Sequence, residues 1–62
     1  MKFVNALAII DTGITCAFRR TSWGTKEELF CYAGNMDFCI NDESSEWDPH
    51  VEDLLADDWV RC

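Results

Sequence analysis

The sequence predicts an α+β fold, in which an N-terminal helix packs on a small antiparallel sheet and a short C-terminal helical turn is followed by a final strand. Three observations predict it. Apolar residues recur at the helical period near the N-terminus, they alternate with polar residues in the segments that follow, and an Asp-Pro pair opens the closing segment. The chain contains no linker, repeat or low-complexity tract, so we expect a single domain over residues 1–62.

The first element is expected to be a helix of about ten residues that begins at Phe3. Its apolar positions recur at steps of three and four residues, at Phe3, Ala6, Leu7 and Ile10. Gly13 stands where a helix commonly ends in a left-handed residue. A helix of this length is not stable alone in water, so it must lie on another element.

Strands and a hairpin are expected after the helix, because apolar and polar residues alternate. The segment 14–19 places Ile14, Cys16 and Phe18 on one face. A tight turn at Gly34-Asn35 joins the segment 28–33 to an antiparallel strand with Met36, Phe38 and Ile40 on one face. Residues 42–46 are expected to form a solvated loop.

The segment 28–33 is apolar on both faces. Leu29, Cys31 and Ala33 lie on one face, and Phe30 and Tyr32 lie on the other. One helix covers only one face of a small sheet. Phe30 and Tyr32 are therefore expected either to form a subunit interface or to be covered by the C-terminal segment.

The closing segment is expected to contain a short helix and then a strand. Asp48 is the expected N-cap, because Pro49 after it suits the first helical position. Apolar residues of the helix fall on one side of it, at Val51, Leu54 and Leu55, while its acids Glu52 and Asp53 lie on the outer side or near the positive N-terminal end. Residues 59–61 resume an extended path that pairs with the sheet edge, and Trp47 and Trp59 are interpreted as packing anchors.

The net charge of −7 is distributed unevenly. Residues 1–36 carry four basic and three acidic residues, a net charge of +1, whereas residues 37–62 carry one basic and nine acidic residues, a net charge of −8. Nucleic-acid binding needs a basic stripe, so we expect no nucleic acid as a partner.

The four cysteines contain no C-x-x-C pair and no nearby histidine, so we expect no metal site. The N-terminal apolar run is too short for a signal peptide, and no stretch approaches the length of a membrane span. We therefore expect a cytoplasmic protein with reduced thiols, in which Cys16, Cys31 and Cys39 act as small hydrophobes on strands. A core this small needs reinforcement, and association with other copies is then the favoured source.

Catalytic machinery is not apparent. His50 is the only side chain with an ordinary pKa near neutrality, and it stands after a proline at a helix start, where surface histidines are common. No phosphate-binding loop or dinucleotide fingerprint is present. We expect a protein that is not an enzyme and that carries no cofactor.

The segment 18–26 has the composition of a nucleotide cradle. It gathers the cations Arg19, Arg20 and Lys26 around Trp23, with small hydroxylated residues such as Thr25 between them. An indole offers a stacking surface for a base, and guanidinium groups pair with phosphate oxygens. The alternative is a polar loop whose tryptophan covers the edge of the core.

The run from Trp47 to Pro49 and the run from Glu52 to Trp59 resemble the C-terminal signature of the second Thoeris anti-defence family of small phage proteins. The N-terminal half is similar to that family too, with a short helix that ends in Gly13, then a strand, then Arg19-Arg20 and the nearby Trp23. This resemblance implies a cytoplasmic sponge in the host bacterial cell. Such a homotetramer binds cyclic signalling nucleotides, glycocyclic ADP-ribose and/or cyclic dinucleotides, and sequesters them without cleaving them.

The ligand-binding residues expected for a sponge are Arg19, Arg20, Trp23, Thr25 and Asp58. Trp23 stacks on a base, and either Arg19 or Arg20 pairs with a phosphate, since adjacent strand residues point to opposite faces. Asp58 either accepts from ribose hydroxyls or base amino groups, or caps the closing turn.

Two other classes of function compete with the sponge. The acidic half would act as a decoy that mimics nucleic acid and inhibits a host defence protein by direct binding, and such attraction weakens with salt. A structural component of a phage or cell assembly would associate without any small ligand.

Overall fold

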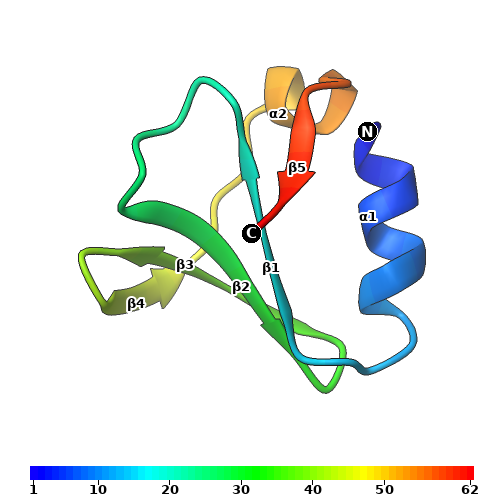
Figure 1. Ribbon diagram of the computed structural model, residues 1–62, viewed down its shortest axis with the longest axis horizontal. Coiled ribbons are helices and arrows are strands. Elements are labelled where there is room, and N and C mark those ends of the chain that lie inside the picture. The colour runs from blue at the N-terminus through cyan, green and yellow to red at the C-terminus, as the bar shows by residue number, and fades with distance from the viewer.

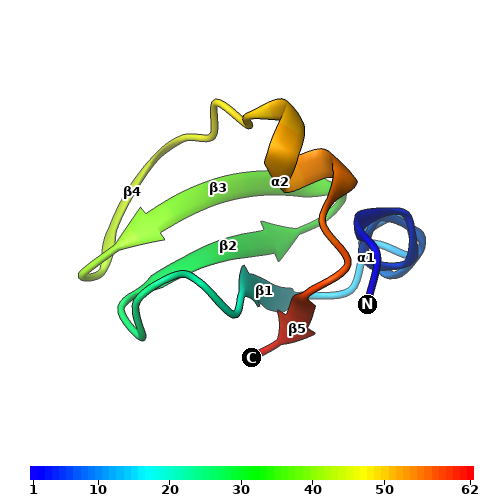
Figure 2. The same cartoon turned by 90° about the horizontal axis from the view of Figure 1, so that it is seen from above.

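The computed structural model describes residues 1–62 and has the α+β fold expected from the sequence (Figure 1). Its elements, in chain order, are α1 (Phe3–Ile10), β1 (Cys16–Arg20), β2 (Glu27–Tyr32), β3 (Asn35–Ile40), β4 (Glu43–Glu46), α2 (Val51–Leu55) and β5 (Trp59–Arg61). The strands form one antiparallel sheet in the order β4-β3-β2-β1-β5. Figure 2 shows the last strand, β5, beside β1, with α1 next to it. No helix is long and apolar enough to cross a membrane.

The core lies on one face of the sheet. Cross-strand partners point to the same face, and the partners Phe18 and Leu29 are both fully buried there. α1 packs on this face with the residues at its helical spacing, Phe3, Ala6 and Ile10. The helix has eight residues and ends at Ile10, where the amide of Gly13 donates to the Ile10 carbonyl at 3.0 Å. Gly13 has a φ of +81°, so the expected left-handed residue after the helix is confirmed.

Two strand boundaries differ from the prediction. β1 begins at Cys16, and Ile14 is exposed outside it. The turn between β2 and β3 is Ala33-Gly34, with φ values of 48° and 81°, and not Gly34-Asn35. Asn35 pairs with Tyr32 as the first residue of β3, so Ala33 lies in the exposed turn and not on the buried face.

The expected loop at residues 42–46 is wrong, because Glu43–Glu46 forms the edge strand β4. A two-residue turn at Asn41-Asp42, with φ values of 52° and 69°, brings β4 back along β3. Both residue types tolerate left-handed backbone, which suits a tight hairpin. The four residues of β4 are all exposed, so no apolar alternation marks the strand in the sequence.

The closing helix α2 differs from the prediction at its start and in its buried side. Its N-cap is His50 and not Asp48. Val51 and Leu55 are 70% and 79% exposed, whereas Asp53 is 8% exposed. The expected inward side of the apolar residues is wrong, because the carboxylate of Asp53 pairs with the sheet and Val51, Leu54 and Leu55 turn to the surface. Glu52 and Asp53 lie in the first turn of the helix, near its positive N-terminal end, which was one of the two positions expected for them.

β5 confirms the expected final strand. It pairs antiparallel with β1, and Trp59 is fully buried while Trp47 is half-buried against the same core. Both tryptophans are therefore packing residues, as expected.

The opposite face of the sheet is uncovered: Phe30 and Tyr32 are 37% and 41% exposed, so the C-terminal segment does not cover them. The four cysteines are free, with Cys16 and Cys31 buried as cross-strand partners.

Candidate functional site

Trp23 lies in the loop that joins β1 to β2, half-buried at the edge of the core. Its amide donates to the carbonyl of Arg20 at 3.0 Å. Its ring meets Phe38 at a centroid distance of 5.3 Å and Trp59 at 5.2 Å, both edge to face. The indole therefore covers the edge of the core, which was the alternative to a nucleotide cradle in the sequence analysis. These contacts fix the orientation of the ring.

Arg20 joins β1 to the closing segment through two ion pairs. Its Nη1 lies 2.8 Å from Oδ1 of Asp53, and its Nε lies 2.9 Å from Oδ1 of Asp58. The hydrogen bonds to Asp58 and then Asp53 raise the pKa of the Arg20 guanidinium. Thr21 donates its hydroxyl to Oδ2 of Asp58 at 2.8 Å. Two carboxylates thus face one guanidinium, so Arg20 offers little positive charge to a phosphate.

Asp53 accepts two further hydrogen bonds, one at the start of α2 and one from β5. The amide of His50 donates to Oδ2 of Asp53 at 3.2 Å, and the indole N–H of Trp59 donates to its backbone carbonyl at 2.9 Å. Sequence reasoning did not select Asp53, because an acid near a helix start is ordinary on a surface. The adjoining Asp58 has a lowered pKa, because Arg20 and then Thr21 donate to its carboxylate.

The sheet separates the two arginines. Arg20 is the cross-strand partner of Trp59, on the face that the helices cover, and Arg19 is the partner of Val60 on the uncovered face. The structure brings Arg20, Trp23 and Asp58 to one side and places Arg19 on the other. Arg19 takes part in no ion pair within the chain.

Thr25 and Lys26 lie in the same loop as Trp23, and both are exposed. Lys26 has no ion-pair partner in the chain. Its backbone carbonyl accepts from the amide of Asn41 at 3.1 Å, so the loop of Trp23 is tied to the turn of the β3–β4 hairpin.

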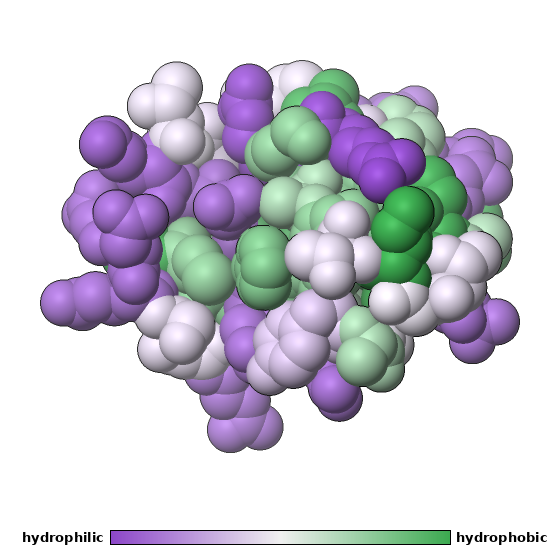
Figure 3. All heavy atoms as spheres, turned by 60° about the horizontal axis from the view of Figure 1, so that its bottom comes forward, coloured by the Kyte–Doolittle hydropathy of each residue, from purple (hydrophilic) through white to green (hydrophobic).

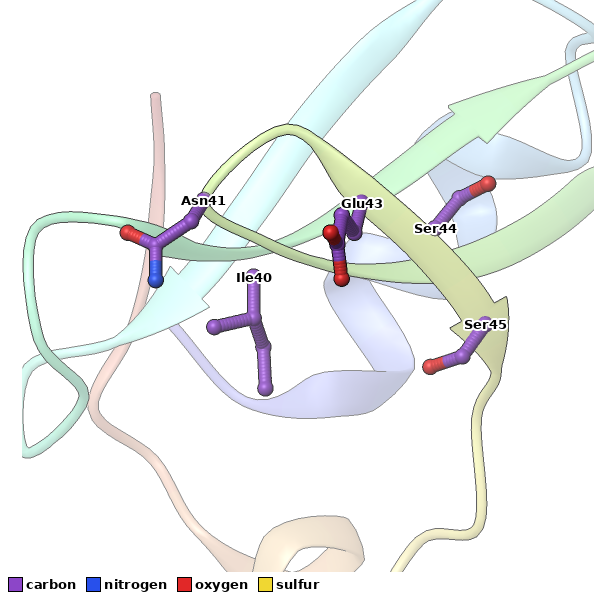
Figure 4. A pocket seen from close by; sticks show the side chains of 5 residues that line it. All are labelled: Ile40, Asn41, Glu43, Ser44 and Ser45. Atoms are coloured by element: carbon purple, nitrogen blue, oxygen red, sulfur yellow. The ribbon is translucent and has the colours of Figure 1, made fainter.

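A hollow of about 330 Å³ lies at this hairpin (Figure 4). Its lining residues are Ile40, Asn41, Glu43, Ser44 and Ser45. None of them was selected as a site residue from the sequence, because Ile40 was interpreted as a strand residue and residues 42–46 as a solvated loop. The pair Asn41-Asp42 is the available signal, since it is typical of a two-residue hairpin turn.

The molecular surface carries extensive apolar area. Figure 3 shows hydrophobic residues across the middle of the molecule and toward α1, while hydrophilic residues gather at the side of the β3–β4 hairpin. The large hydrophobic residues exposed in the structure are Met1, Val4, Leu7, Ile14, Phe30, Tyr32, Ile40, Val51, Leu54 and Leu55. Patches of this kind commonly mark interaction surfaces.

Comparison with known proteins gives one match. A family model described as the Thoeris anti-defense 2-like domain matches residues 1–62. No curated protein and no solved structure matches the chain. The match spans both stretches that resemble this family in the sequence.

Proposed function

Because the chain belongs to the Thoeris anti-defense 2-like family, we propose that it counters Thoeris defence as a sponge, which binds immune signalling cyclic nucleotides in the host cytoplasm and holds them intact. The observation that carries the proposal is the family match over residues 1–62. The proposed ligands are glycocyclic ADP-ribose and cyclic dinucleotides.

The fixed orientation of the Trp23 indole supports its proposed role of stacking on a base. Its contacts with Phe38 and Trp59 orient the ring before any ligand arrives, so less conformational freedom is lost on binding. The ring is only half-buried, which leaves surface for a base. Stacking of a base on an aromatic side chain contributes about 1–3 kcal/mol.

The phosphates are proposed to meet Lys26 or Arg19, two cations of the segment around Trp23 that lack ion-pair partners. Lys26 lies in the loop of Trp23. Arg19 lies on the uncovered face with Phe30 and Tyr32, so it approaches a Trp23 only where a second copy packs. The proposed assembly is a homotetramer in which the ligand lies at a seam between subunits. Arg20 then has a positioning role, since it holds α2 and β5 against β1.

Binding of the two candidate ligands tests the sponge. Isothermal titration with glycocyclic ADP-ribose and with cyclic di-AMP should show saturable binding, and ligand released by denaturation should be chemically unchanged. The Trp23→Ala variant should bind at least tenfold more weakly, about 1.4 kcal/mol, because the stacking surface is lost. Trp47→Ala is the matched control, since it removes another half-buried indole that lies outside the loop.

Three outcomes count against these assignments. Unchanged affinity in Trp23→Ala removes Trp23 from the site. Cleaved ligand contradicts sequestration. If neither nucleotide binds, the sponge function itself is contradicted.

The acidic decoy is less well supported. Asp53 and Asp58 are engaged with Arg20 inside the chain, so part of the acidity of the closing segment is not available to a basic partner. A decoy would lose its partner steeply as salt rises, since interactions between exposed charges are screened. Affinities measured at rising salt concentration separate the two classes of function, since the sponge should lose less affinity for its nucleotide than a decoy loses for its protein partner.

A further inference from the structure

We propose that the hollow of the β3–β4 hairpin is a ribose subsite, in which Glu43 accepts hydrogen bonds from the hydroxyls of the sugar. This inference rests on the proposed function, because it assigns one part of the cyclic nucleotide to one part of the surface. It adds Glu43, Ser45 and Ile40 to the site expected from the sequence, which consists of Arg19, Arg20, Trp23, Thr25 and Asp58.

The size of the hollow fits a fragment of the ligand. Small-molecule pockets have volumes of about 300–1,000 Å³, so a hollow of about 330 Å³ lies at the lower limit. A whole cyclic dinucleotide is larger than this space. One sugar, with its base or phosphate outside, matches it better.

The side chains around the hollow suit a polyhydroxylated and uncharged group. Figure 4 shows the side chains of Glu43 and Ser45 on the same side of the hairpin as Ile40, as expected for alternate residues of one strand. A carboxylate accepts hydrogen bonds and repels phosphate, and acidic side chains bind ribose hydroxyls in dinucleotide-binding folds. Ser45 donates its hydroxyl to the Phe38 carbonyl at 3.4 Å, which leaves the oxygen free to accept from a sugar.

The hairpin that forms the hollow lies beside the loop of Trp23. Ile40 follows Phe38 by two residues on β3 and therefore lies on the same face, where Phe38 packs against the indole of Trp23. The amide of Asn41 binds the carbonyl of Lys26, so the loop and the hairpin turn lie side by side. A base on Trp23 and a sugar over Ile40 would thus occupy adjoining positions, with the backbone of Lys26 on the loop beside the hairpin turn.

The walls of the hollow are held in place before a ligand binds. β4 pairs with β3 at four successive positions, from Ile40 with Glu43 to Asp37 with Glu46. The two-residue turn leaves little freedom to the backbone at Asn41 and Asp42. As an edge strand, β4 also has backbone N–H groups that no other strand uses, and these are additional donors for a sugar or its phosphate.

The test compares two isosteric substitutions on the same strand. Glu43→Gln and Glu46→Gln each remove one negative charge from an exposed residue of β4. Glu46 is the partner of Asp37, on the opposite face of the sheet, and does not line the hollow. Dissociation constants of both variants are measured with glycocyclic ADP-ribose and with cyclic di-AMP, and backbone amide shifts are followed by NMR.

We expect Glu43→Gln to bind about tenfold more weakly than the wild type, because the amide accepts fewer hydrogen bonds from the sugar than the carboxylate does. Glu46→Gln should bind as tightly as the wild type or slightly more tightly, since it only reduces repulsion of the phosphates. Only Glu43→Gln should therefore lose affinity if Glu43 touches the sugar. Ligand-induced shifts should include the amides of residues 40–45.

Each other result overturns the subsite. Equal affinity of Glu43→Gln and wild type, equal changes in the two variants, or shifts that spare residues 40–45 would leave the sponge in place and remove the sugar from this hollow. Failure of both nucleotides to bind the wild-type protein would refute the sponge and the subsite together.

Discussion

Replacement of Trp59 by Phe should destabilise the protein more than any other aromatic substitution of equal size. Trp59 is fully buried, and its ring centroid lies 5.0 Å from that of Phe3 and 5.2 Å from that of Trp23. Its indole N–H donates to the backbone carbonyl of Asp53 at 2.9 Å. Trp59 therefore connects α1, the loop of Trp23 and α2 to the sheet.

The magnitude follows from two losses. Phenyl in place of indole removes about 40 Å³ of side chain, which at about 24 cal/mol per Å³ of cavity costs about 1 kcal/mol. The carbonyl of Asp53 loses its buried donor, which costs about 1–3 kcal/mol more. The total of about 2–4 kcal/mol is a large part of the few kcal/mol by which a domain of this size is stable.

Urea unfolding followed by far-ultraviolet circular dichroism measures the loss, at one fixed protein concentration because association contributes to apparent stability. The midpoint should fall by about 2–4 M for a slope of about 1 kcal/mol per M. Trp47→Phe is the control: Trp47 is half-buried, and its indole N–H has no acceptor within the chain. Its cost should stay near or below about 1 kcal/mol. Equal costs for the two variants would refute the account of the Trp59 hydrogen bond.

Acid should weaken the ion pairs of Arg20. The hydrogen bonds that Arg20 and Thr21 donate to Asp58 hold the pKa of this carboxylate below its usual value. Their contribution to the free energy of unfolding is present above about pH 4 and is lost as pH falls through the folded pKa; Asp58→Asn should remove this part of the pH dependence in urea unfolding. Burial raises the pKa of Cys31 to about 12. Iodoacetamide at about pH 8 should therefore alkylate the exposed Cys62 and spare Cys31 until the protein unfolds, as peptide mass spectrometry can measure.

Local periodicity predicted most of the fold. The helical spacing of Phe3, Ala6 and Ile10 and the left-handed Gly13 follow from residues that are close in the chain, as does the alternation of β1 and β2. β4 escaped prediction because its four residues are polar and all exposed, and only backbone pairing with β3 makes them a strand.

The sequence selected Trp23 as a candidate site residue, and the structure places it in the β1–β2 loop against the core. The partners of Arg20 were not foreseen. Arg20 and Asp58 are 38 positions apart, and the fold pairs them with one another. Arg20 was one of two alternatives for the phosphate contact, and Asp58 was expected either to contact the ligand or to cap the closing turn. The hollow near Glu43 was missed because it exists only once β4 returns along β3.

The sequence by itself determined the helices and strands that show a periodic pattern of apolar residues. It also determined the uneven charge and the family signature of the closing segment. Only the tertiary structure decided which charges are paired and which faces are covered: it buried Asp53, left Leu55 in solvent, and placed Arg19 and Arg20 on opposite sides of the sheet. The physical reason is that hydrogen bonding and helical or strand periodicity act between near neighbours, whereas burial and ion pairing depend on which distant segments the fold brings together.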